Sequence, residues 1–224
     1  MSASLPEDNP GPHSPDLCLT AGEPFDRAEA SLIMLHGRGA TAESIIGLAE
    51  YLDLTGFHIV APQADNYTWY PYSFLEDTTA NEPYVSSALA TIDTVVERLR
   101  SPSSDLSRVY LLGFSQGACL VSEYAARAAA KGDGARRFGG LVALSGGLIG
   151  PRDTVRSYSG SLAGTPAFIG CSDVDMHIPE ERVRETADTL SRLGVAVDLQ
   201  IYPGMGHTIN KDEIAHINAM LARG

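Results

Sequence analysis

The chain alternates short apolar runs with longer stretches in which apolar side chains recur every three or four positions. Continuous apolar runs are typical of strands buried on both faces of a sheet, and the longer spacing is typical of surface helices. Strands are predicted at about residues 17–20, 31–36, 57–61, 108–112, 140–144, 165–169 and 195–202, the first as an edge strand. Helices are predicted at about residues 41–52, 83–100, 116–131, 179–193 and 210–222. This alternation indicates an α/β fold, a mostly parallel sheet with helices on both faces.

Two segments depart from the alternation. Residues 1–16 contain four prolines and almost no apolar side chains, so burial cannot offset the entropy cost of ordering them. We predict a flexible tail there, with His13 as an ordinary tail residue, followed by one domain over residues 17–224. The connection 62–82 has little regular patterning and carries Trp69 and Tyr70.

The chain has 224 residues and a formal net charge of −12. This charge opposes binding to nucleic acid or anionic lipid, and no apolar run reaches the length of a membrane-spanning helix. We therefore expect no nucleic-acid partner and no stable membrane association. The three cysteines are an odd number without a C-x-x-C pair, and no signal-peptide pattern is present. These features predict a cytoplasmic protein.

A serine lies at the predicted corner between a strand and a helix. The segment Gly113-Phe114-Ser115-Gln116-Gly117 has the G-x-S-x-G pattern of a nucleophile elbow, in which glycines make room for a tight, strained turn. The free amides at the start of the helix favour negative charge beside Ser115. Ser145 also follows a strand, but it lacks the preceding glycine and a clear following helix, so we assign it a supporting place.

A nucleophilic serine needs a base and an acid, which follow it along the chain in this type of fold. His207 follows the last predicted strand, and both Asp173 and Asp175 follow the strand before it. All three therefore fall at the edge where parallel strands end and ligands bind. We predict His207 as the base and favour Asp173 as the acid, because it comes three residues after Gly170. Asp175 stays open as the alternative.

The reaction also needs two donors for the developing oxyanion. The backbone amide of Gln116, directly after the serine, is one candidate, and that of Arg38 in the segment His36-Gly37-Arg38-Gly39 is the other. We expect His36 to brace this segment, whereas the Arg38 side chain meets either an anionic substrate or solvent. The run from Asp173 to His177 lacks a supporting glutamate or cysteine for a metal site. We expect no metal and no cofactor.

Taken together, these motifs resemble the phospholipase/carboxylesterase family of α/β-hydrolases, which includes acyl-protein thioesterases and small bacterial carboxylesterases. The likeness runs from about residue 30 to the C-terminus. It rests on Leu35-His36-Gly37-Arg38-Gly39, Ala61-Pro62-Gln63-Ala64, Trp69-Tyr70, Gly113-Phe114-Ser115-Gln116-Gly117, Gly170-x-x-Asp173 and Gly206-His207.

The resemblance implies a seven-stranded, mainly parallel sheet, a Ser-His-Asp triad and cleavage of carboxylic esters or thioesters without a cofactor. It also implies that the connection 62–82 forms a wall of the acyl pocket. There Trp69 and Tyr70 either bind the substrate or simply pack within the loop. One departure concerns the acid: the segment from Asp173 to Pro179 is longer than the family pattern D-x-x-V-P.

We therefore expect a serine carboxylesterase for small-molecule esters with short or medium acyl chains, aryl esters included, that acts as a monomer or homodimer. Acyl-protein thioesterase and lysophospholipase activities are alternatives with the same chemistry. A catalytically idle ligand-binding fold, a hydrolase of strained cyclic esters and a perhydrolase are the other readings.

Overall fold

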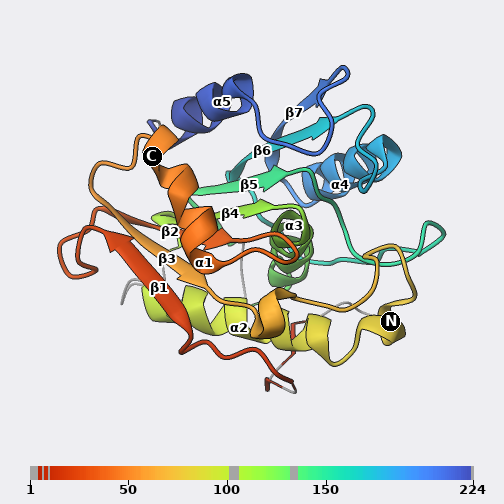
Figure 1. Ribbon diagram of the computed structural model, residues 1–224, viewed down its shortest axis with the longest axis horizontal. Coiled ribbons are helices and arrows are strands. Elements are labelled where there is room, and N and C mark those ends of the chain that lie inside the picture. The colour runs from red at the N-terminus through yellow and green to blue at the C-terminus, as the bar shows by residue number, and fades with distance from the viewer. Residues whose placement is uncertain (1–4, 7, 10, 101–105, 132–135, 223–224) are drawn as a thin grey trace.

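The computed structural model describes residues 5–6, 8–9, 11–100, 106–131 and 136–222. Seven strands form one sheet in the order β1-β3-β2-β4-β5-β6-β7 (Figure 1). The edge strand β1 is antiparallel to β3, and all other neighbours are parallel. The strands are β1 (Cys18–Gly22), β2 (Ala30–Leu35), β3 (Phe57–Pro62), β4 (Val109–Phe114), β5 (Gly140–Leu144), β6 (Pro166–Ser172) and β7 (Ala196–Tyr202). The predicted seven-stranded, mainly parallel sheet is confirmed.

Helices cover both faces of this sheet, as the sequence predicted. One face carries α2, α3 and α4, and the other carries α1 and α5 (Figure 1). Their bounds are α1 (Ala42–Ile46), α2 (Tyr84–Leu99), α3 (Gln116–Ala128), α4 (Glu180–Arg192) and α5 (Lys211–Leu221).

The central strands show why their sequences are continuously apolar. In β2, Leu32 and Met34 pack with α1 and α5, whereas Ile33 and Leu35 pack with α2 and α3. Successive side chains of a strand point to opposite faces, so a sheet covered on both sides needs an apolar residue at every position. All four side chains are at most 1% exposed.

The first predicted helix is shorter than expected. Thr41 caps α1 and shares a capping box with Ser44, as a helix start requires. The α-helix ends at Ile46, and residues Gly47–Tyr51 continue as a 3₁₀ turn. Glycine at the junction weakens the α-helix locally, because it adds backbone freedom and no side-chain packing.

The prediction of a flexible tail over residues 1–16 is wrong for Asn9 and for residues 11–16, which pack against α2 and the connection 62–82. His13 is only 2% exposed and makes hydrogen bonds to both elements. The composition argument counted apolar burial alone, whereas this segment is held by polar groups that find partners on the domain. The remaining residues of the predicted tail that lie outside the described ranges are 1–4, 7 and 10.

Candidate active site

The turn between β4 and α3 places Ser115 at a sharp corner. Its backbone has φ 56° and ψ −116°, a strained conformation that costs about 1–3 kcal/mol in a non-glycine residue. A Cβ on Gly113 would lie 2.3 Å from the backbone of Gly117, and a Cβ on Gly117 would lie 2.1 Å from the carbonyl oxygen of Leu35. Both glycines are therefore sterically required, as the elbow pattern predicted.

The loop after β7 brings an imidazole to this serine. His207 Nε2 lies 3.0 Å from Ser115 Oγ, and His207 Nδ1 lies 2.7 Å from Oδ2 of Asp175. A carboxylate only accepts hydrogen bonds, so Nδ1 carries the proton and Nε2 is free to accept one from the hydroxyl. The ring is held between Phe114 and His177, whose ring centroids lie 5.0 and 4.9 Å away.

The prediction that Asp173 contacts the imidazole is wrong. Asp173 is exposed and accepts a 2.7 Å hydrogen bond from the backbone amide of Gly204. The strand β6 continues to Ser172, so Asp173 leaves the sheet at its edge, and two more residues are needed for the chain to turn under His207. The sequence did contain a signal for Asp175 as the residue that contacts His207. The segment Asp175-Met176-His177-Ile178-Pro179 fits the family pattern D-x-x-V-P with isoleucine in place of valine.

The carboxylate of Asp175 is enclosed by donors. Its side chain has no exposed area, and Oδ1 accepts hydrogen bonds from the amides of His177 and Ile178 at 2.9 and 3.1 Å. The Cys171 thiol lies 3.8 Å from Oδ2. Burial by itself raises the pKa of Asp175, but the bonds from His207 and the two amides outweigh it and hold the pKa below its ordinary value. The group is an ionised acceptor at neutral pH.

Two side chains at the end of β6 fix the loop that carries His207. Ser172 Oγ accepts a 3.0 Å hydrogen bond from the amide of Gly206, and Asp173 holds the amide of Gly204. Both glycines have positive φ, at 67° and 78°, a conformation that favours glycine. Asp173 therefore contributes to the loop's shape rather than to the contact with the imidazole.

The two predicted oxyanion donors lie on loops that meet at the serine. Gln116 is the first residue of α3, and its amide belongs to the group without partners in the helix. On the other side, a Cβ on Gly37 would lie 3.2 Å from Ser115 Cβ, so the segment carrying Arg38 abuts the nucleophile. The guanidinium of Arg38 donates to the carbonyl oxygens of Pro71 and Tyr72, both at 2.7 Å. It thus ties this segment to the connection 62–82.

His36 braces the same segment, as the sequence predicted. Its Nδ1 donates to the carbonyl oxygen of Gly37 at 2.8 Å, and its Nε2 accepts from the amide of Ala64 at 3.1 Å. Burial lowers the pKa of His36, more than its bond to Gly37 raises it. The ring is a neutral structural bridge between β2 and the connection 62–82.

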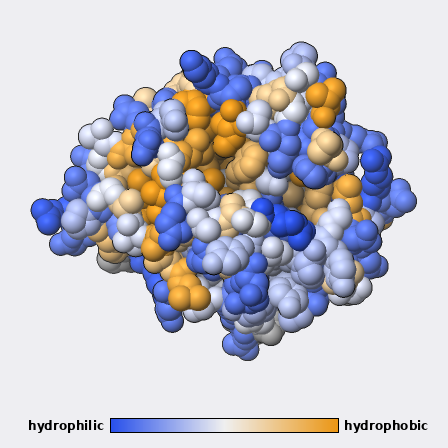
Figure 2. All heavy atoms as spheres, in the orientation of Figure 1, coloured by the Kyte–Doolittle hydropathy of each residue, from blue (hydrophilic) through white to orange (hydrophobic). Residues whose placement is uncertain are grey.

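A recess of about 470 Å³ opens beside Ser115. Tyr70 and Phe74 line it from the connection 62–82, Cys119 lines it from α3, and Ile178 lines it from the loop after β6. Figure 2 shows apolar surface gathered around the hollowed middle of this face, where the loops after β4, β6 and β7 approach each other in Figure 1. Tyr70 thus lies where a substrate contact was predicted.

Trp69 does not. Its side chain is fully buried and is absent from the lining of the recess. This contradicts the substrate-binding alternative for Trp69 and agrees with the other one, packing within the loop. Ser145 is also fully buried, which excludes the rival nucleophile from reach of a substrate. No local pattern pointed to Phe74, Cys119 and Ile178 as lining residues, because their positions depend on how distant loops fold together.

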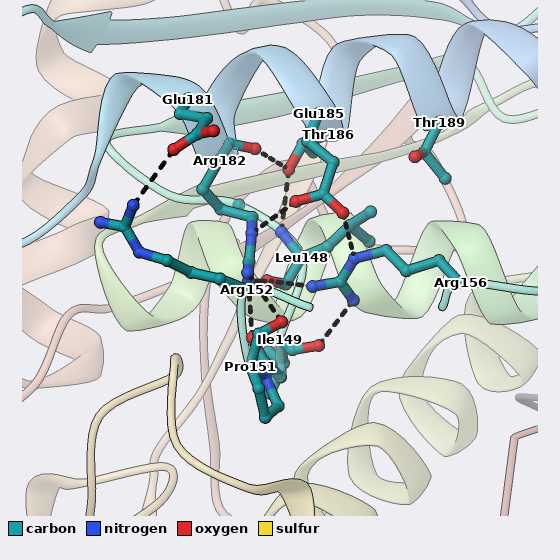
Figure 3. A network of polar contacts seen from close by, with 12 residues as sticks. Leu148, Ile149, Pro151, Arg152, Arg156, Glu181, Arg182, Glu185, Thr186 and Thr189 are labelled. Carbon is teal, nitrogen blue, oxygen red and sulfur yellow. Dashed lines mark hydrogen bonds and ion pairs between the residues drawn. The ribbon is translucent and has the colours of Figure 1, made fainter. Parts of the chain in front are cut away.

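A buried arginine network supports one wall of the recess (Figure 3). Arg182 of α4 donates to the carbonyl oxygens of Leu148 and Gly150 and to Glu185, at 2.6 to 2.8 Å. The amide of Gly150 in turn donates to the carbonyl oxygen of Phe74 at 2.7 Å. The Arg182 guanidinium lies 5.8 Å from the centre of the Phe74 ring. The loop after β5 and the wall residue are therefore fixed to α4.

Within the described parts of the chain, no group of three or more histidine, cysteine, aspartate or glutamate side chains is arranged to hold a metal ion. The oxygens of Asp175 are instead occupied by the donors already described. No helix among these residues has both the length and the apolar character needed to cross a bilayer.

Comparisons with known proteins agree with this fold. A family model described as Phospholipase/Carboxylesterase matches residues 18–223. The chain is similar to a crystal structure of a phospholipase/carboxylesterase from Dyadobacter fermentans DSM 18053, with 40% identity, a TM-score of 0.87 and coverage of 96% of this chain and 100% of that chain. Esterase PE8 shares the fold at a TM-score of 0.73 and 22% identity, with 92% and 97% covered. The architecture is thus that of an α/β-hydrolase.

Sequence comparison adds a eukaryotic relative. Acyl-protein thioesterase 1 of Gibberella zeae is 29% identical over 119 residues, which is 52% of this chain and 48% of that protein. The match therefore spans about half the length of this curated relative.

Proposed function

Because the chain belongs to the phospholipase/carboxylesterase family, we propose that it is a serine carboxylesterase that hydrolyses short- or medium-chain carboxylic esters, aryl esters among them. The observation that carries the proposal is the continuous chain of hydrogen bonds from Ser115 through His207 to Asp175. This arrangement of hydroxyl, imidazole and buried carboxylate is the one that activates a serine for attack on a carbonyl.

In the first half of the reaction, Ser115 Oγ attacks the carbonyl carbon while His207 Nε2 takes the hydroxyl proton. Asp175 accepts the hydrogen bond from Nδ1 and stabilises the imidazolium that forms. The tetrahedral intermediate collapses when Nε2 returns the proton to the leaving alcohol, and an acyl-enzyme remains. In the second half, water attacks the acyl carbon while His207 Nε2 takes its proton. His207 then returns this proton to Ser115 Oγ as the bond to the acyl group breaks and the carboxylic acid leaves.

The oxyanion of both intermediates is stabilised by the amides of Gln116 and Arg38. The loop contacts around Ser115 support this role, because His36 and the Arg38 guanidinium fix the donor segment before substrate arrives. Donors that are already oriented lower the barrier without reorganising during the reaction. Removing one such donor costs about 10²–10³ in rate in a comparable enzyme.

The size of the recess supports a small acyl group. Its volume of about 470 Å³ lies toward the small end of the range of roughly 300–1,000 Å³ found for ligand pockets. Tyr70 and Phe74 supply aromatic walls, which suit an aryl or short alkyl acid. The proposed substrate is thus a small-molecule ester. We further propose that the enzyme acts in the cytoplasm, as a monomer or a homodimer.

Thioester hydrolysis is a second candidate, supported by the partial match to an acyl-protein thioesterase. The same nucleophile, base and oxyanion donors serve a thioester, because only the leaving atom changes. The two candidate activities differ in the space that they need outside the recess. A protein substrate requires room at the entrance of the recess for a peptide, and a small ester does not.

The test is hydrolysis of a series of p-nitrophenyl esters of increasing chain length, with acyl thioesters and a lysophospholipid alongside. We expect turnover of the short esters by the wild type and a loss of about 10⁶-fold in Ser115→Ala. A fluorophosphonate probe should label the wild type and leave Ser115→Ala unlabelled. Turnover that survives Ser115→Ala, or ligand binding without any turnover by the wild type, would contradict the proposal.

A further inference from the structure

Trp69 links the two loops that carry the proposed oxyanion donors. Its backbone amide donates to Gln116 Oε1 at 3.1 Å, and Gln116 Nε2 donates to the carbonyl oxygen of Tyr70 at 2.8 Å. Its indole Nε1 donates to the carbonyl oxygen of His36 at 2.9 Å. One buried residue therefore contacts the start of α3 on one side and the His36–Arg38 segment on the other.

The N-terminal segment holds this tryptophan from behind. His13 Nε2 lies 2.8 Å from the carbonyl oxygen of Trp69, and the amide of Asp65 donates to His13 Nδ1 at 3.1 Å. An amide only donates, so Nδ1 is the acceptor and Nε2 carries the proton that bonds to Trp69. The His13 ring also packs against the Trp69 and Tyr84 rings, at 5.2 and 6.3 Å between centroids.

We call Asn9 and residues 11–16 the N-terminal strap. The strap is fastened to α2 at two buried side chains. The amide of His13 donates to Ser87 Oγ at 2.9 Å, and Ser87 Oγ donates to Asn9 Oδ1 at 2.7 Å. Asn9 Nδ2 reaches the carbonyl oxygen of His13 and Thr91. His13 is therefore held both by hydrogen bonds to its backbone and by hydrogen bonds to its ring nitrogens.

We propose that His13 is a positioning residue of the active site, which holds Trp69 and through it the two amides that bind the oxyanion. The strap lies outside the region that the family model matches, which begins at residue 18. It contacts the matched region at Trp69, Asp65 and α2, next to the loops that carry the proposed oxyanion donors. This inference rests on the proposed esterase function.

The hydrogen bond from the Asp65 amide to His13 Nδ1 depends on a neutral imidazole. Burial lowers the pKa of His13, more than its bond to Trp69 and the nearby Asp65 carboxylate raise it. Protonation would place an N–H on Nδ1 directly against the N–H of Asp65, and this acceptor would be lost. The other titratable groups against it are Tyr84 and His36, which is itself kept neutral by burial. Acidification should therefore cost the ring its bond from Asp65, whereas Nε2 still donates to Trp69.

Three variants separate the functions of the ring. His13→Gln keeps a donor near the position of Nε2, His13→Asn keeps an acceptor near the position of Nδ1, and His13→Phe keeps only a ring. Trp69 is the single tryptophan of the chain, so its emission spectrum reports on the contact directly. We would measure this emission and the kcat and KM for a short p-nitrophenyl ester, with active sites counted by fluorophosphonate titration.

We expect His13→Phe to lower kcat per active site about tenfold with KM within about twofold, because a misplaced oxyanion donor affects the transition state more than the bound substrate. The emission of Trp69 should shift in the same variant. His13→Gln should retain most of the kcat and the wild-type emission, and His13→Asn should resemble His13→Phe. Ser87→Ala, which loosens the strap without touching Trp69, should give a smaller loss in kcat.

Equal kcat per active site in wild type, His13→Phe and Ser87→Ala would overturn the positioning role while leaving the esterase proposal intact. A loss that disappears after active-site counting would do the same, since it would mean only fewer folded molecules. Absence of ester turnover by the wild type would overturn the proposed function and this role with it. The Trp69 emission distinguishes the cases, because it reports the His13 contact whether or not turnover occurs.

Discussion

The imidazole of His177 stands edge-on against that of His207, with ring centroids 4.9 Å apart and an angle of 75° between the rings. The Phe114 ring also contacts His207, with 5.0 Å between ring centroids. Because the amide of His177 also binds Asp175, one residue contacts both the base and its acid. His177 therefore limits how far the His207 ring can turn.

We predict that His177→Ala lowers kcat about threefold to tenfold, because the ring of His207 gains freedom to leave the geometry needed for proton transfer. His177→Phe should preserve most of the rate, since it keeps an aromatic edge at the same place. Steady-state kinetics on one short ester measure both variants. An equal loss in the two variants would mean that a polar property of the imidazole matters and that packing does not.

The acid is identified by a pair of matched substitutions. Asp175→Asn should lower kcat about 10⁴-fold, as loss of the tautomer-fixing carboxylate does in a related triad. Asp173→Asn removes the charge but keeps an oxygen that can accept from the Gly204 amide, and it should cost less than about tenfold. Both are measured on the same ester with active sites counted. The assignment fails if the two effects are reversed.

The sequence predicted the sheet, the elbow and the histidine because each depends on local pattern. A continuous apolar run predicts a buried strand, and Gly113 and Gly117 are required by clashes within one turn. The choice between Asp173 and Asp175 depended on where β6 ends, and the strand continues to Ser172, three residues beyond its predicted end at Ile169. Strand ends are set by pairing with the neighbouring strand, which a single sequence does not display.

The burial of Trp69 and of His13 has a common physical cause. The polar atoms of both side chains bond to residues 33 or more positions away along the chain, and composition describes only how much apolar area a segment offers. A proline-rich segment can be held in place when its polar groups pair with buried ones such as Ser87. The sequence left two roles open for both Trp69 and Tyr70, and the contacts of the folded chain separate them, because only Tyr70 lines the recess.

Glu213 gives a prediction for stability. Its side chain is fully buried at the start of α5. One carboxyl oxygen accepts from the amide of Asn210, and the other has no hydrogen-bond partner among the residues that the structure describes. Burial raises its pKa to about 7, from an ordinary value of 4.5. The folded state therefore favours the protonated form. The stability that this preference supplies is complete below pH 4.5 and is lost as the pH rises through about 7.

Glu213→Gln keeps the capping geometry without a charge. We expect it to raise the free energy of unfolding by about 1–3 kcal/mol at pH 8 and to change it little at pH 4. Urea unfolding at the two pH values measures the difference. Asp212→Asn, at the neighbouring exposed position, serves as the control and should show a smaller pH dependence. An equal effect of Glu213→Gln at both pH values would mean that Glu213 is not protonated in the folded protein.

Cys119 gives the last prediction, which concerns acyl-chain length. It lies one helical turn after Ser115, lines the recess and is fully enclosed, and its amide bonds to the carbonyl oxygen of Ser115 at 3.0 Å. Burial raises the pKa of its thiol to about 11, so at neutral pH it is a small apolar wall and not a nucleophile. A larger side chain here would shorten the space available to an acyl chain without altering His207 or Asp175.

We therefore expect Cys119→Leu to lower kcat/KM for hexanoyl and octanoyl esters at least tenfold more than for acetyl esters, because the added carbons of leucine occupy the volume that the longer chains need. Cys119→Ala should move the preference toward longer chains. Cys119→Ser keeps the size of the side chain and controls for loss of the sulfur. If all three variants scale the rates for every chain length equally, the acyl chain binds on the other side of Ser115 and the recess receives the alcohol.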